Sequence, residues 1–255
     1  MKILDTHAHL CAESFDKDLE KVIDRASAAG IANIVAVGEN LADAEKNIQL
    51  SARYNQILPA AGLYPAILDL EQAVAVQNFV RRHAKQLAAI GEVGLDFWAV
   101  QDEGGKELQR NIFAGFIDLA LETGLVLNVH SRSAGRHAID MLLAKGALKV
   151  QMHAFDGKAS NAKAAVEAGY FFSIPPSIVR SRQKQKLVCK LSLSSLLLET
   201  DSPVLGPDHQ VRNEPANAVI ALEAVAELKR VTREEAAELM YENSRLLYGN
   251  IGDSG

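Results

Sequence analysis

Two histidines near the start of the chain, His7 and His9, have the residue type and the spacing of metal ligands. They end a short apolar run that begins at Ile3, and one residue separates them. On a β-strand, residues i and i+2 point to the same face, so both imidazoles are expected to enter one space. Asp5 lies one step further back on that face. The segment predicts part of a metal site, or only a strand end that happens to carry two histidines.

Further residues that could bind a metal lie at or near the carboxyl ends of four later apolar segments. They are Glu92, His130, His153 and Asp201. Buried ionisable groups are costly unless they pair with each other or bind a metal, which favours a metal site. Imidazole and carboxylate ligands predict a divalent ion, with Zn²⁺, Mn²⁺, Mg²⁺, Fe²⁺ and Co²⁺ as the candidates.

Six ligands are more than one tetrahedral ion uses, so we predict two metal ions. Glu92 is the predicted bridge between the ions. One ion would also be held by His7, His9 and Asp201. The other would be held by His130 and His153.

The elements that must position these residues alternate between strands and helices. Short apolar runs predict eight strands, over residues 2–6, 31–37, 57–62, 88–93, 125–130, 149–153, 170–174 and 195–199. Apolar residues at helical spacing and turn signals predict helices between and after them, over residues 16–29, 41–54, 72–87, 107–122, 134–144, 160–168, 181–189, 214–229 and 233–247. The segment around Gly104-Gly105 is predicted to be a loop, and Asn213 and Thr232 to be helix N-caps.

Strict alternation predicts a parallel sheet, and eight units in 255 residues predict an α/β fold, a (β/α)₈ TIM barrel, as a single domain over residues 1–255. No G-x-G-x-x-G follows the first strand, which weighs against an open dinucleotide-binding sheet. The carboxyl ends of barrel strands meet at one mouth, where active sites of this fold lie. The six candidate ligands should therefore converge. Among the other histidines, His83 and His137 fall on helix surfaces, whereas His209 could reach the mouth.

Composition and charge narrow the class of protein. The chain is 48% hydrophobic with a net charge of −5, and it lacks the basic stripe that binds duplex nucleic acid through counterion release. A nucleic-acid substrate would have to be held locally, at a few phosphates. Two cysteines imply no disulfide framework, and the sequence shows no signal-peptide pattern and no apolar run of membrane length. We expect a cytoplasmic protein without a membrane or an obligate protein partner.

Six ordered motifs resemble those of the TatD family, metal-dependent deoxyribonucleases of the amidohydrolase superfamily. They are Asp-Thr-His-Ala-His-Leu at 5–10, Gly-Glu-Val-Gly-Leu-Asp at 91–96, Val-His-Ser-Arg at 129–132, His-Ala-Phe-Asp-Gly at 153–157, Glu-Thr-Asp-Ser-Pro at 199–203 and Arg-Asn-Glu-Pro at 212–215. The runs at 131–136 and 172–177 look most like the branch called TatD domain-containing protein three. The resemblance covers nearly the whole chain.

The resemblance implies a TIM barrel with divalent metals at the strand ends and hydrolysis of phosphodiester bonds in DNA. It also implies that His7, His9, Glu92, His130, His153 and Asp201 are the ligands. One position departs from the family, which usually has Gly-x-His-Pro after the third strand where this chain has Tyr64. A tyrosine could donate a hydrogen bond to substrate but carries no positive charge near neutral pH. The substrate class and a third ion therefore stay open.

A mechanism follows as a hypothesis, with Asp201 and Glu92 as the catalytic residues. A metal-activated water would attack phosphorus in line, and Asp201 would orient that water and accept its proton. Arg132 and Arg212 would clamp the phosphate, unless they form ordinary salt bridges at the rim.

Three further carboxylates are expected to support the ligands from behind. Glu199 would hold a ligand. Asp96 would do the same or fix the loop after the fourth strand. Asp5, which first looks like a ligand, is expected to hold the end of the first strand in place, since the ligand set is already complete.

Two alternatives remain at this stage. The same ligands on the same fold also serve hydrolysis of other esters, lactones and amides, because fold does not determine function. The barrel could instead be a catalytically weak metal-binding scaffold. Our first expectation is a phosphodiesterase acting on single-stranded or end-frayed DNA.

Overall fold

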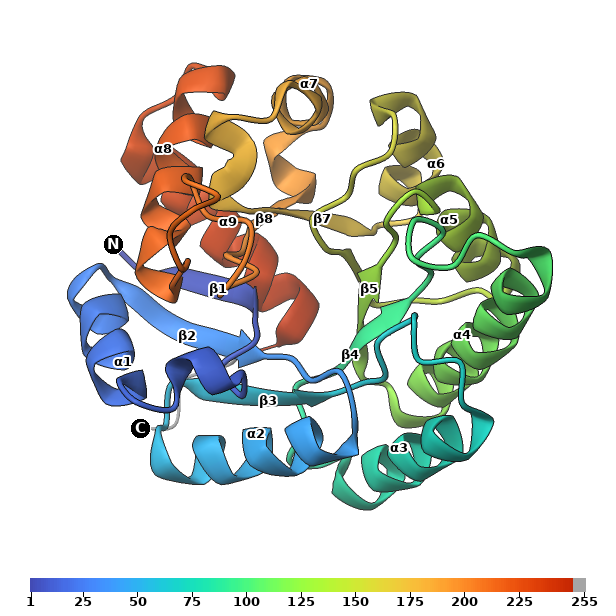
Figure 1. Cartoon of the computed structure of the whole chain (residues 1–255). Coiled ribbons are helices and arrows are strands. Elements are labelled where there is room, and N and C mark those ends of the chain that lie inside the picture. The colour runs from blue at the N-terminus through green and yellow to red at the C-terminus, as the bar shows by residue number, and fades with distance from the viewer. Residues whose placement is uncertain (250–255) are drawn as a thin grey trace.

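Residues 1–249 are described by a computed structural model (Figure 1), and residues 250–255, which the single-domain prediction also covered, lie outside the described part. Eight parallel strands follow one another around a barrel in sequence order: β1 (Ile3–Ala8), β2 (Ile31–Ala36), β3 (Ile57–Ala61), β4 (Ala89–Gly94), β5 (Val126–His130), β6 (Val150–Met152), β7 (Phe171–Ile174) and β8 (Leu196–Leu198). The predicted (β/α)₈ TIM barrel is confirmed.

Helices surround the strands in Figure 1. The α-helices of residues 1–249 are α1 (Leu19–Ala28), α2 (Leu41–Arg53), α3 (Leu70–His83), α4 (Glu103–Thr123), α5 (Gly135–Ala144), α6 (Lys163–Glu167), α7 (Arg182–Lys190), α8 (Ala218–Lys229) and α9 (Arg233–Tyr248). Short 3₁₀ helices are η1 (Glu13–Phe15), η2 (Ala159–Ala162), η3 (Pro176–Val179), η4 (Leu193–Ser195) and η5 (Pro215–Asn217). None of the described helices is both long enough and apolar enough to cross a membrane.

The barrel closes between β1 and the segment that follows β8. Ala8 and Ser202 form a parallel bridge there. The backbone N–H of His9 donates to the carbonyl of Ser202 at 2.7 Å, and the N–H of Asp201 donates to the carbonyl of His7 at 2.8 Å. Closure of the barrel therefore places Asp201 beside the two histidines of the first strand.

A polar network fills part of the barrel interior. The hydroxyl of Tyr248, at the end of α9, donates to Oε1 of Gln151 at 2.5 Å. The amide of Gln151 donates in turn to the hydroxyls of Thr6 and Ser173, each at 2.9 Å. Buried polar groups are costly unless they are paired, so this network keeps the interior below the mouth well ordered.

One predicted loop is wrong, because α4 begins at Glu103 and includes Gly104 and Gly105 in its first turn. The carboxylate of Asp102 caps the helix by accepting a hydrogen bond from the N–H of Gly105 at 2.7 Å. A Cβ at Gly105 would lie 2.5 Å from Cγ1 of Val100. Glycine is therefore required here for close packing, not for a flexible loop.

The two predicted N-caps have different outcomes. Thr232 is confirmed, since it forms a capping box with Glu235 at the start of α9. The prediction for Asn213 is wrong, because Glu214 precedes η5 and α8 starts only at Ala218. The amide of Asn213 instead donates to the carbonyls of Thr200 and Val204, each at 2.8 Å. It therefore holds the loop that carries Asp201.

Candidate metal centre

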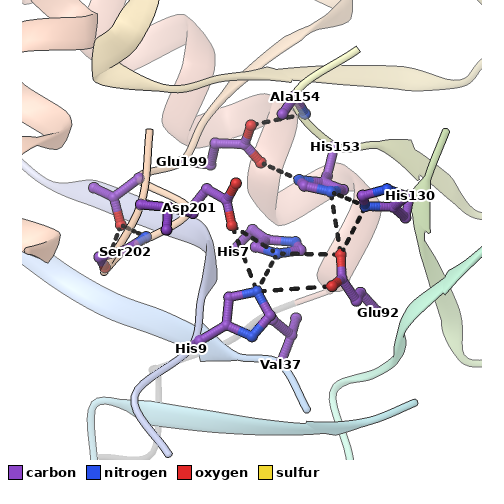
Figure 2. Close-up of polar contacts among 12 residues, drawn as sticks. His7, His9, Val37, Glu92, His130, His153, Ala154, Glu199, Asp201 and Ser202 are labelled. Carbon is purple, nitrogen blue, oxygen red and sulfur yellow. Dashed lines mark hydrogen bonds and ion pairs between the residues drawn. The ribbon is translucent and has the colours of Figure 1, made fainter. Parts of the chain in front are cut away.

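The six predicted ligands converge at the mouth of the barrel, where their side chains turn toward a common space (Figure 2). They come from β1, β4 and β5 or from the segments that follow β1, β6 and β8: His7, His9, Glu92, His130, His153 and Asp201. Most of them are buried, and all except His7 border, together with Arg132, a pocket of about 420 Å³. Short apolar strands thus bring residues that are far apart in the sequence to one place.

One group of potential ligand atoms consists of His7, His9 and Asp201. The Nε2 atoms of the two histidines are 3.3 Å apart. Oδ1 of Asp201 lies 3.4 Å from Nε2 of His7 and 3.5 Å from Nε2 of His9. Asp201 has a φ of 54°, in the left-handed region that few residues other than glycine adopt. Barrel closure holds it in this conformation and directs its carboxylate toward the histidines.

A second group consists of Glu92, His130 and His153. Oε2 of Glu92 lies 3.1 Å from Nδ1 of His130 and 3.2 Å from Nε2 of His153. The carboxylate also faces the first group, with Oε1 at 3.9 Å from Nε2 of His9. Glu92 therefore lies between the two groups, where a bridging ligand would have to be. The set of four imidazoles and two carboxylates fits divalent ions in number and in chemistry.

Hydrogen bonds from the other ring nitrogens orient the histidines. Nδ1 of His7 lies 2.8 Å from Oδ1 of Asn128, whose amide nitrogen donates to the carbonyl of Thr6. Because that oxygen can only accept, Nδ1 of His7 donates to it, and Nε2 faces Asp201. Nε2 of His130 lies 3.0 Å from Oδ2 of Asp96, which leaves Nδ1 facing Glu92. These contacts orient both rings so that one nitrogen of each faces the space where a cation would bind.

Two of the three predicted supporting carboxylates lie behind the ligand histidines. Asp96 contacts His130 and also accepts a hydrogen bond from the hydroxyl of Tyr64 at 3.0 Å. Oε2 of Glu199 lies 3.7 Å from Nδ1 of His153. Its Oε1 accepts from the N–H of Ala154 at 2.8 Å, which holds the segment next to that histidine.

The third carboxylate, Asp5, binds the backbone and the hydroxyl of Thr200. Its two oxygens accept hydrogen bonds from the N–H of Thr200 at 2.8 Å and from the Thr200 hydroxyl at 2.6 Å. Burial raises the pKa of Asp5 to about 7, although the bonds from Thr200 lower it. Asp5 ties β1 to the residue before Asp201, and it contacts no ligand side chain directly.

Histidines and carboxylates of the site shift each other's pKa values. Burial alone would raise the pKa of Glu92, but His130 and His153 hold it well below its usual range. Burial would lower the pKa of His130, but Glu92 and Asp96 raise it to about 10. Glu199 and Glu92 similarly raise the pKa of His153 to about 9, against burial. Each of these rings must lose one proton before it can bind a metal.

The two predicted phosphate-binding arginines lie in different surroundings. Arg132 borders the pocket, and no ion pair is found for it among residues 1–249. Arg212 forms two hydrogen bonds to Asp18, at 2.8 and 2.7 Å, and lies over the ring of Phe15. It does not border the pocket. The structure therefore corrects the prediction for Arg212, which forms the rim salt bridge that was its alternative.

The remaining candidates take little part in the site. Tyr64 borders the pocket, but its hydroxyl already donates to Asp96. His209 is exposed and lies beside Asp208, so it does not reach the pocket. His137 is exposed on α5, whereas His83 is only partly exposed and stacks on Phe79.

Sequence reasoning overlooked several residues of the site, including Glu39, which borders the pocket with Oε1 4.0 Å from Nδ1 of His9. Asn128 orients His7, and its signal was a polar residue two positions before His130 in an otherwise apolar strand. Lys184 is buried, borders the pocket and donates from Nζ to the carbonyl of Ala154 at 2.8 Å. Ser131 also borders the pocket, and its buried hydroxyl has no hydrogen-bond partner among residues 1–249. Only tertiary contacts distinguish these residues from ordinary polar ones.

We expect the Asn128→Ala substitution to weaken metal binding by roughly 10- to 100-fold, because it removes the acceptor that fixes the tautomer of His7. The measurement is a competition titration with a chelating dye. Asn111→Ala, on the exposed surface of α4, is the matched control and should bind metal like the wild type. Asn128→Asp keeps an acceptor and should retain more affinity than Asn128→Ala. Equal affinity of Asn128→Ala and the wild type would show that Asn128 has no such role.

Comparisons with known proteins agree with one another. A family model described as TatD related DNase matches residues 4–249. Deoxyribonuclease TATDN3 of Homo sapiens is 46% identical over 98% of this chain and 95% of its own length. The uncharacterized metal-dependent hydrolase YabD of Bacillus subtilis is 35% identical over 96% of this chain and 98% of its own. The crystal structure of YJJV, a TatD homolog from Escherichia coli K12, superposes with a TM-score of 0.89 at 26% identity, covering 96% of this chain and 97% of that one.

Proposed function

This chain belongs to the TatD family, and we propose that it is a divalent-metal-dependent hydrolase that cleaves phosphodiester bonds in DNA. The observation that carries the proposal is the convergence of four histidines and two carboxylates beside an open pocket. The family model and the names of the relatives, deoxyribonuclease and metal-dependent hydrolase, support the same activity.

Two metal ions would be held by the six residues at the mouth, with Glu92 shared between them. One ion would contact His7, His9 and Asp201, and the other His130 and His153. Two of the four overlapping groups of potential ligand atoms, His7–His9–Asp201 and Glu92–His130–His153, support this division, whereas the other two include Glu199 or Glu39. Bound divalent ions would supply an activated water at neutral pH and would neutralise charge on the phosphate oxygens.

Asp201 is the proposed general base. Burial would raise its pKa, but His7 and His9 hold it below the usual range, so the carboxylate is ionised at neutral pH and can accept a hydrogen bond. Its Oδ1 lies within 3.5 Å of both histidines. It can therefore orient a water molecule in the pocket, and it would accept the proton of that water, whose pKa bound metal ions would lower.

Arg132 is the proposed phosphate ligand, with help from Ser131. The guanidinium of Arg132 borders the pocket and can donate two parallel hydrogen bonds to a phosphate. The unpartnered hydroxyl of Ser131 is a further donor at the same rim. Lys184 adds a nearby positive charge, although burial lowers its pKa. These groups bind one phosphate locally, as a chain of net charge −5 requires.

A substitution pair tests this assignment. We expect Arg132→Ala to raise KM for a single-stranded oligonucleotide by roughly 10- to 100-fold, because a charged hydrogen-bond donor to the phosphate is lost. Arg212→Ala should leave KM close to the wild-type value, because Arg212 binds Asp18 outside the pocket. Steady-state kinetics of both variants give the two KM values that are compared. A larger rise in KM for Arg212→Ala than for Arg132→Ala would reverse the assignment.

The substrate class is tested by direct comparison. The purified protein, loaded with Mn²⁺, Mg²⁺, Zn²⁺, Fe²⁺ or Co²⁺, is assayed on a single-stranded oligonucleotide, a duplex with frayed ends, a blunt duplex and a panel of lactones. We propose that the single-stranded and frayed substrates are cleaved fastest, since five of the six ligands border a pocket and not a flat surface. Turnover of lactones with inert phosphodiesters would contradict the proposed function.

A further inference from the structure

The only tryptophan of the chain, Trp98, is strongly exposed next to the candidate site. It lies between β4 and α4, two residues after Asp96, and 58% of its surface is accessible. Single exposed apolar side chains are common on protein surfaces, so exposure alone assigns Trp98 no role. Its indole ring is large and flat, and a planar group can stack on it.

Arg132 covers one face of this tryptophan. The Cζ atom of its guanidinium lies 3.7 Å from the centroid of the indole ring, which is stacking distance for a cation on an aromatic face. Arg132 borders the pocket and Trp98 does not, so the guanidinium is the member of the pair nearer to the ligand residues. We call this pair the Trp98–Arg132 stack.

The Trp98–Arg132 stack is held by the same residues that support the metal ligands. Oδ1 of Asp96 accepts hydrogen bonds from the N–H groups of Trp98 at 3.0 Å and Ala99 at 2.8 Å. The N–H of Phe97 donates to the carbonyl of Arg132 at 3.0 Å. Oδ2 of Asp96 contacts His130. These hydrogen bonds therefore fix the position of the stack relative to His130 without a bound substrate.

A planar cation stacked on an indole can do two things for a nucleic acid. Its N–H edge donates to a phosphate oxygen, and its open face can stack on a nucleobase, as arginine planes and aromatic rings do in complexes with single strands. A base reaches such a surface only when it is unpaired.

Resting on the proposed function, we infer that the Trp98–Arg132 stack binds the unpaired nucleobase next to the phosphodiester that is cleaved. Trp98 is a positioning residue in this proposal, because it holds the guanidinium plane of Arg132 against the pocket. The stack selects substrates that carry a base beside the scissile phosphate over equally charged substrates without one. Specificity for unpaired strands would then come from this contact and not from a broad basic surface.

The first experiment compares two substrates with three proteins. One oligonucleotide carries bases throughout, and the other has tetrahydrofuran residues in place of the nucleosides on both sides of the scissile phosphate. Loss of one base stack corresponds to roughly 5- to 100-fold in affinity. We expect the wild type to prefer the base-bearing strand by a factor in that range, mainly through KM. Trp98→Ala should lose this preference, and Trp98→Phe should keep much of it.

A second experiment does not need catalysis. Since Trp98 is the only tryptophan, the intrinsic tryptophan fluorescence of the metal-free protein reports on the stack alone. Titration with an all-thymidine oligonucleotide should change the emission, and a fully abasic strand of equal length should leave it unchanged. Leu148→Ala, at another exposed apolar side chain, serves as the control and should respond like the wild type. Thermal unfolding of each variant shows that it is folded.

The outcomes separate this inference from the proposed function. A wild type that cleaves DNA without any preference for base-bearing strands, or a Trp98→Ala variant that keeps the full preference, overturns the role of the stack alone. A wild type that cleaves no phosphodiester overturns the proposed function. In that case, an equal fluorescence response to both strands overturns the stack as well, whereas a response to the base-bearing strand alone supports it.

Discussion

We expect the Asp201→Asn substitution to lower kcat for phosphodiester cleavage by roughly 10²- to 10⁴-fold, the range typical of removing a general base. Asparagine has nearly the same shape, but it cannot accept a proton from water near neutral pH. The backbone N–H of residue 201 still donates to the carbonyl of His7, so the barrel should remain closed. Steady-state kinetics give kcat, and a thermal melt reports on folding.

A matched control lies on the same loop. Asp208 is exposed and outside the pocket, so Asp208→Asn should have kinetics close to those of the wild type. Metal analysis of Asp201→Asn then separates its two assigned roles. A fall in kcat with full metal content supports the role of base, and a fall in metal content supports the role of ligand. Wild-type kcat in Asp201→Asn would show that neither role is correct.

We also expect a large loss of activity when the metal is removed. Dialysis against a chelator should reduce kcat/KM by about 10³-fold or more, because the ions contribute several kcal/mol to the stabilisation of the transition state. Adding back the ion that copurifies should restore activity and raise the Tm, since a ligand that binds only the folded state stabilises it. Elemental analysis before and after dialysis gives the number of ions.

The pKa shifts set the pH dependence of metal binding. Without metal, the pKa of His130 is raised to about 10 and that of His153 to about 9, so both rings hold protons at pH 7. Each proton must be displaced, and the apparent affinity should increase by about tenfold per pH unit for each displaced proton as the pH rises toward these values. Affinity that does not change between pH 6 and pH 8 would contradict this arrangement.

Glu92→Gln provides the specific control for the metal experiment. The substitution removes the charge of the carboxylate that lies between the two groups of ligands. We expect fewer ions per chain than in the wild type, whereas Glu223→Gln on the surface of α8 should bind the full number. Full metal content in Glu92→Gln would contradict a bridging role for Glu92.

Much of the fold could be predicted from local sequence. A strand buried on both faces needs a continuous apolar run, and a helix on the outside needs apolar residues at helical spacing, so both leave a local signal. All eight strands of the barrel were predicted in the right order. The first turn of α4 was not, because the tight packing of Gly105 against Val100 depends on residues that local propensity does not describe.

The candidate ligands were also visible in the sequence, because polar residues at the ends of apolar strands are conspicuous. Parallel strands of a closed barrel must end at one mouth, so the topology alone predicts that these side chains meet. The relatives named as metal-dependent hydrolases agree with the chemistry expected of such a set.

Only the tertiary structure determines which residues contact the ligands. Asn128 bonds to His7 across 121 positions, and Asp5 bonds to Thr200 across 195. Arg212 and Arg132 looked alike in the sequence, yet one binds Asp18 and the other stacks on Trp98. Periodicity and motifs describe neighbours along the chain, whereas hydrogen bonds and stacking depend on side-chain positions that exist only after the barrel has closed. The sequence alone therefore predicted which residues meet at the mouth, and the fold decided how each one is oriented.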